Sequence, residues 1–85
     1  MNKHFKDAQY YLRRAAETAS AGVKEELEPV EERFEALTGG EEEPEPSGLE
    51  RVQERVEDIE SRAEGEARRA LTSARGRIER YRETE

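Results

Sequence analysis

The sequence predicts an all-α protein, an antiparallel two-helix hairpin resembling a coiled coil that dimerises into a four-helix bundle. Three observations carry this prediction: two apolar stripes with helical spacing, a polar segment between them, and no segment patterned as a strand. Only 32% of the residues are apolar and 44% are charged, a composition close to that of disordered chains. The placement of the apolar residues, described next, argues against disorder.

The first stripe runs from Phe5 to Leu37 and the second from Leu49 to Tyr81, each in nine steps over 32 residues. The mean step is therefore near the 3.6 residues of one α-helical turn. These spans predict one helix over about 3–37 and another over about 48–83, joined by a loop at 38–48. The whole chain, 1–85, is then a single helical hairpin domain.

The segment TGGEEEPEPSG at 38–48 contains the residues that end one helix and start the next. Thr38, Gly39 and Gly40 are expected to end the first helix, because glycine tolerates the left-handed conformation common just past a helix end. Ser47 and Glu50 match a capping box at the start of the second. Proline removes a backbone donor and crowds the preceding turn, so Pro29 is expected to kink the first helix rather than split it.

Antiparallel pairing predicts a register in which facing residues have numbers that sum to about 86, as Phe5 and Tyr81 do. Four-residue steps follow one another in both stripes, at Ala19, Val23 and Leu27 and at Ile59, Ala63 and Ala67, and in this register they face each other. Gly22 and Gly65 also come opposite, which predicts a close approach of the two backbones.

A lone two-helix hairpin leaves the flanks of its core in contact with water, so we expect it to pair with a second copy. An antiparallel homodimer would set the acidic half of each chain against the basic half of the other. Residues 1–20 carry a formal charge of +2, residues 21–46 carry −8, residues 47–64 carry −3 and residues 65–85 carry +2. The expected oligomer interface consists of Tyr11, Ala15, Ala16, Ala67, Ala70 and Leu71.

Arginines near the open end of the hairpin, interleaved with tyrosines, form a candidate basic surface. Such residues bind phosphates and stack on bases, but arginines also cover apolar surface and complement helix ends. The predicted surface consists of Arg13, Arg14, Arg68, Arg69, Arg75, Arg77, Arg80 and Arg82.

Four stretches resemble a family of short, acidic haloarchaeal proteins classed as a domain of unknown function. They read MNKHFKDAQYYLRRAAETA at 1–19, GVKEELEPVEERFEALTG at 22–39, EEEPEPS at 41–47 and RAEGEARRALTSARGRIERYR at 62–82. The resemblance implies a cytoplasm rich in salt, in agreement with the net charge of −7. It implies no activity, catalytic residue or ligand.

Catalytic and metal-binding patterns are weak. His4 is the single imidazole, with Asp7 one turn away, and we expect it to be a surface residue. Glu25, Glu28 and Glu32 lack the histidine partners of di-iron bundles. With no cysteine, no phosphate-binding glycine motif and no apolar run long enough for a membrane span, we expect a cytoplasmic protein that is not an enzyme and uses no cofactor or metal.

The function expected from the sequence is therefore structural, or that of a protein-interaction module acting as a homo-oligomer. The expected partner is a second copy of the chain, with another helical protein as a further possibility and no membrane. The alternative is a nucleic-acid-binding hairpin that uses the basic open end.

Overall fold

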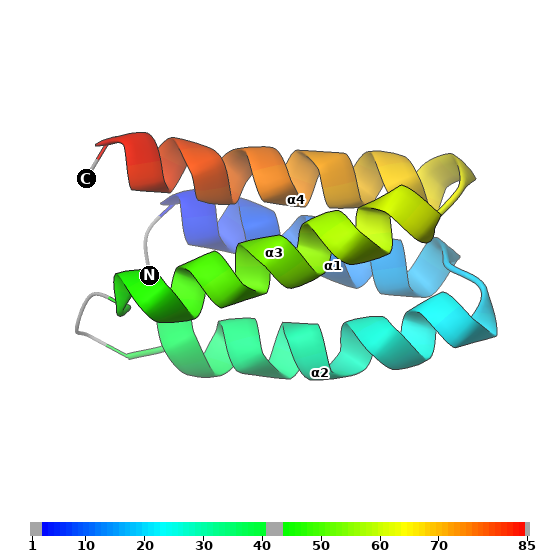
Figure 1. Ribbon diagram of the computed structural model, residues 1–85, viewed down its shortest axis with the longest axis horizontal. Helices are drawn as coiled ribbons and strands as arrows, with labels where there is room; N and C mark the ends of the chain where they lie inside the picture. Colours follow the sequence, from blue (N-terminus) through cyan, green and yellow to red (C-terminus); the bar gives the residue numbers. More distant parts are fainter. Residues whose placement is uncertain (1–2, 41–43, 85) are drawn as a thin grey trace.

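The computed structural model describes residues 3–40 and 44–84, and these fold into four helices (Figure 1). They are α1 (Lys3–Thr18), α2 (Ala21–Thr38), α3 (Pro46–Arg62) and α4 (Gly65–Thr84). The described residues contain no strand. The all-α prediction is confirmed, while the two long helices are replaced by four short ones.

Each predicted helix is divided near its middle. Ser20 has the extended conformation (φ −64°, ψ 162°), and so has Ala63 (φ −81°, ψ 159°). Gly65 follows in the left-handed region with φ 63°, where a residue without Cβ is favoured. Because both halves of a stripe can then face one another, a single chain encloses a core that two long helices would leave open to water.

The four helices form an up-and-down bundle that measures 34 × 20 × 19 Å along its principal axes. Helix α1 packs on α4 and α2, and helix α3 packs on α2 and α4. The α1–α2 and α3–α4 turns lie at one end of the bundle, and the end of α2 and the start of α3 lie at the other (Figure 1). The antiparallel pairing predicted for the two halves of the chain is retained between α1 and α4 and between α2 and α3.

The core combines residues of both stripes from all four helices. Phe5 on α1 joins three of them, because its ring lies 4.3 Å from that of Tyr81 on α4 and 5.8 Å from that of Phe34 on α2, centroid to centroid. The first of these contacts confirms the predicted register at the open end. The largest fully buried side chains are Phe34, Leu12, Leu27, Leu49, Ile59, Leu71, Ile78, Val52 and Val56.

Three local predictions are wrong. Gly39 at the end of α2 is right-handed (φ −80°), and it is suited to its place because an added Cβ would lie 2.8 Å from the Glu35 carbonyl oxygen. Helix α3 starts before the Ser47–Glu50 capping box, with Pro46 in its first turn and no side-chain cap hydrogen bond. A Cβ added at Gly22 or Gly65 would meet no atom within 4 Å, so neither glycine serves a close backbone approach.

Helix α2 continues through Pro29. The interruption of the first long helix lies at Ala19–Ser20, well before the kink expected from Pro29. Proline cannot donate a backbone hydrogen bond, but this loss costs less than a loss of packing when the residues around it are anchored in a core. Leu27 and Val30 on either side of Pro29 are buried. Residues 41–43 of the predicted loop lie outside the described residues.

Candidate functional surfaces

The predicted oligomer interface lies inside the single chain. Tyr11 is partly buried against the core, and the other five predicted interface residues are buried in it: Ala15, Ala16, Ala67, Ala70 and Leu71. The chain folds back at its two turns and covers these side chains with its own helices. In this conformation they are unavailable to a second copy.

The charges separate across the bundle rather than along it. Helix α1 has four Lys and Arg against two acidic residues, and α4 has six Arg against three Glu. Helix α2 has two basic against six acidic residues, and α3 has three against five. Since α1 lies beside α4 and α2 beside α3, one side of the bundle is basic and the opposite side is acidic. The charge complementarity predicted between two chains is thus found within one.

The predicted basic surface is divided between ion-paired and exposed arginines. Arg75 contacts Glu60 and Glu79, Arg77 lies 3.6 Å from a carboxylate oxygen of Asp7, and Arg82 donates a hydrogen bond to Gln53. The carboxylates beside Arg75 and Arg77 reduce the positive charge available to a phosphate, whereas Arg82 is exposed and its partner Gln53 is neutral. The remaining members of the predicted surface are exposed: Arg13, Arg14, Arg68, Arg69 and Arg80.

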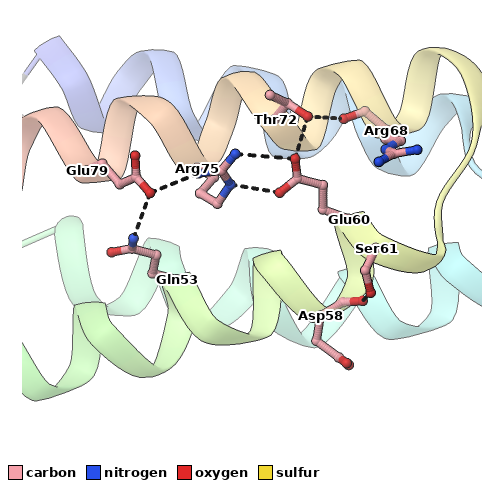
Figure 2. Close-up of polar contacts among 8 residues, drawn as sticks. All are labelled: Gln53, Asp58, Glu60, Ser61, Arg68, Thr72, Arg75 and Glu79. Carbon is pink, nitrogen blue, oxygen red and sulfur yellow. Dashed lines mark hydrogen bonds and ion pairs between the residues drawn. The ribbon is translucent and has the colours of Figure 1, made fainter.

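A polar network joins α3 to α4 (Figure 2). Arg75 Nε donates to Glu60 Oε1 at 2.7 Å and Arg75 Nη1 donates to Glu79 Oε1 at 2.8 Å. Thr72 Oγ1 donates to Glu60 Oε2, and Gln53 Nε2 donates to Glu79 Oε1. The geometry fixes how α4 lies on α3 beside the core.

The pKa of Glu60 reflects opposing effects within this network. Burial is the largest effect and raises the pKa, but hydrogen bonds from Arg75 and Thr72, together with the positive charge of Arg75, outweigh it, and the net pKa is lowered. The same hydrogen bond to Glu60 raises the pKa of Arg75. The pair is therefore a charged structural contact.

A shallow groove of about 210 Å³ lies on the basic side between α1 and α4. Tyr10 is 60% exposed, the one exposed large hydrophobic side chain among the residues described. Its ring packs edge-on against Tyr11, with centroids 5.3 Å apart. The groove is lined by Tyr10, Tyr11, Arg14, Glu66, Arg69, Ala70 and Ser73. We call these residues the tyrosine groove.

A second groove, of about 300 Å³, lies between α2 and α3 and was missed by the sequence analysis. Arg33, Arg51 and Arg55 line it together with Pro29, Val30 and Val52. The sequence contained a signal for this groove. The predicted register, in which the numbers of facing residues sum to about 86, places Arg33 opposite the span from Arg51 to Arg55. Two acidic residues already contact Arg55, at 3.7 Å from Glu26 and 3.6 Å from Asp58.

An acidic groove of about 490 Å³ lies between α1 and α2, lined mainly by glutamates of α2. The pKa of Glu31 in this groove is raised, chiefly by burial, and further by the neighbouring charges of Glu28, Glu17 and Glu35, against a lowering effect of Arg13. A raised carboxyl pKa means that ionised Glu31 destabilises the fold. The other ionisable residues that line the groove are Arg13, Glu17, Lys24, Glu28, Glu32 and Glu35.

The candidates for catalysis and metal binding lie on two different helices, with His4 and Asp7 on α1 and Glu25, Glu28 and Glu32 on α2. Across residues 3–40 and 44–84, no three His, Cys, Asp or Glu side chains are placed to hold a metal ion. Glu25, Glu28 and Glu32 are exposed, and His4 is partly buried near the start of α1. In the same described ranges, no helix has both the length and the apolar character needed to cross a membrane.

Comparison with known proteins identifies a family. No curated protein and no solved structure matches the chain. The model of one family, described as a family of unknown function (DUF7553), matches residues 1–84. Because this match covers almost the whole chain, the protein belongs to the DUF7553 family of unknown function.

Proposed function

We propose that this protein is a non-enzymatic protein-interaction module that acts as a homo-oligomer and presents the tyrosine groove to a protein partner. The observation that carries the proposal is the exposure of Tyr10 in a groove on the basic side that Arg14 and Arg69 also line. Tyrosine and arginine, together with tryptophan, are enriched at the energetic centres of protein interfaces. A partner with acidic side chains around an apolar centre fits this surface.

The salt-rich cytoplasm expected from the sequence favours such a surface. At molar salt the Debye length is about 3 Å, so contacts between separated charges are weak. Burial of tyrosine rings does not depend on unscreened charge, whereas phosphate binding weakens steeply with salt. A protein partner is therefore favoured over nucleic acid at this groove.

Capture of partners at native salt tests the proposal. The tagged chain is compared with a Tyr10→Ser/Arg69→Glu variant and with Arg51→Ser, a control in the groove between α2 and α3. We expect protein partners to bind the wild type and the control and to be lost from the groove variant. Loss of binding in the control as well would contradict the proposal, and capture abolished by nuclease would support the nucleic-acid alternative.

Salt is expected to stabilise the fold. Screening reduces repulsion among the carboxylates of the acidic groove, where burial and the neighbouring carboxylates raise the pKa of Glu31. We expect the midpoint of thermal unfolding to rise between 0.1 M and 2 M KCl. The rise should be smaller for Glu31→Gln, because that variant removes one of the repelling charges. Helicity that is maximal without salt would contradict adaptation to a salt-rich cytoplasm.

A further inference from the structure

The two turns that divide the stripes lie together. Ala19–Ser20 connects α1 to α2, Ala63–Glu64 connects α3 to α4, and both stand at the same end of the bundle (Figure 1). Residues of the two turns share one small cavity of about 140 Å³, lined by Ala19, Ser20, Val23, Arg62, Ala63, Glu64 and Ala67. A movement of one turn therefore affects the other.

The apolar stripes continue in phase through both turns. The steps from Ala15 through Ala19 to Val23, and from Ile59 through Ala63 to Ala67, are four residues each. This is the spacing of one face of a continuous helix. A stripe interrupted by a permanent turn has no need to stay in phase, so the apolar pattern is also compatible with straight helices.

We propose that this chain also exists as a domain-swapped dimer, formed when both turns straighten and each chain becomes a long two-helix hairpin. The α1–α4 half of one hairpin then packs on the α2–α3 half of the second copy. The contacts of α1 with α4 and of α2 with α3 stay within a chain, while those of α1 with α2 and of α3 with α4 form between chains. This rests on the proposed homo-oligomer and specifies how it assembles.

No new surface is required for the exchange. Ala15, Ala16, Ala67, Ala70 and Leu71, which are buried within the closed chain, are buried in the same surroundings across the two chains. The basic side of one chain again meets the acidic side, now supplied by its partner. Exchange of identical elements between protomers is a low-cost route to a dimer because it reuses the contacts of the monomer.

Gly65 and Ser20 control the equilibrium in opposite directions. Gly65 has φ 63° in the closed chain, a conformation unfavourable for alanine, whereas alanine is favoured over glycine within a helix. Gly65→Ala thus disfavours the closed chain and favours the dimer. Ser20 has φ −64°, which suits proline, but proline inside a straight helix removes a hydrogen bond and breaks it. Ser20→Pro thus favours the closed chain.

Light scattering on the full chain measures this shift. Since each dimer contains two changed residues, we expect Gly65→Ala to strengthen dimerisation on the order of 1,000-fold and Ser20→Pro to leave a monomer. Gly76→Ala is the matched control, because Gly76 lies inside α4 in both forms and an added Cβ meets no atom within 4 Å. A Gly65→Ala chain that remains as monomeric as Gly76→Ala would overturn the proposal.

A pair of cysteines distinguishes the swap from other dimers. Gln53 on α3 and Glu79 on α4 are hydrogen-bonded at 3.2 Å, and the chain has no cysteine of its own. In a Gln53→Cys/Glu79→Cys background, a short thiol cross-linker should join two chains in the swapped dimer and one chain in the monomer. Gly65→Ala dimers linked only within each chain would overturn the swap and leave the proposed homo-oligomer standing. If circular dichroism shows that Gly65→Ala does not fold, the two cysteines are placed in a chain that keeps Gly65, and cross-linking is carried out at millimolar protein concentration. Links between chains would then support the swap, and links only within chains would overturn it.

Discussion

Replacing Phe34 with alanine is expected to lower the free energy of unfolding by about 3–5 kcal/mol, the range for truncation of a buried phenylalanine. The Phe34 side chain is 0% exposed, and its ring packs edge-on against that of Phe5. A domain of this length has a total stability of roughly 4–13 kcal/mol. The truncation therefore removes a large share of what holds the bundle together.

Urea unfolding followed by circular dichroism measures the loss. The matched control is Tyr10→Ala, which removes another aromatic ring, but one that is 60% exposed, and should change stability by no more than about 0.5 kcal/mol. Equal effects of the two substitutions would contradict the burial of Phe34. A small effect of both substitutions would mean that the contact among the rings of Phe5, Phe34 and Tyr81 does not stabilise the end of the bundle at which α1 begins and α4 ends.

The helical content and the pairing of the two halves followed from the sequence. Apolar spacing near 3.6 residues is a strong signal, because it persists over 32 residues in each stripe. The contact of Phe5 with Tyr81 followed from the register that this spacing predicts. Both results depend on an apolar periodicity that extends over many helical turns, so a single residue that departs from it has little effect on the prediction.

The two breaks were not predicted because their local signals are weak. Ala19–Ser20 and Ala63–Glu64 contain no proline, and Ala63 belongs to the apolar stripe. Pro29 carried the stronger local signal, yet the helix continues through it. Tertiary packing determines where the helices break. Folding back at the midpoint buries both halves of each stripe within one chain, and this gain is not visible in the helix propensity of single residues.

The candidate surfaces were likewise only partly predictable from the sequence. The basic character of the residues on α1 and α4 was visible in the sequence, but the pairing of Arg75 with Glu60 depends on the α3–α4 turn, which brings 60 and 75 together. In a straight second helix these residues would lie four turns apart along one rod. The acidic groove between α1 and α2 likewise exists only because the first stripe folds back.

Removing Arg75 is expected to have the second largest effect. The Arg75 side chain is 27% exposed and that of Glu60 is 15% exposed, so water replaces only part of the lost contact. Arg75→Leu leaves Glu60 with Thr72 as its remaining hydrogen-bond donor in the network and should lower the free energy of unfolding by about 1–3 kcal/mol. Glu60→Leu/Arg75→Leu should recover part of this loss, because no carboxylate is then left without its partner.

The stability lost in Arg75→Leu should depend on pH, and the lowered pKa of Glu60 determines the direction of this dependence. Its pKa in the fold is lowered from the ordinary value of 4.5, so the carboxylate contributes stability above that value and loses it as the pH falls through the lowered pKa. Wild type and Arg75→Leu should therefore differ most at neutral pH and converge below about pH 4, where Glu60 becomes protonated in the unfolded chain and then in the fold. Urea unfolding from pH 3 to pH 7 measures the difference, with Arg51→Leu, which lies away from Glu60 in the groove between α2 and α3, as the control. A difference that stays constant with pH would show that Arg75 acts through the packing of its stem on the helices and not through its charge on Glu60.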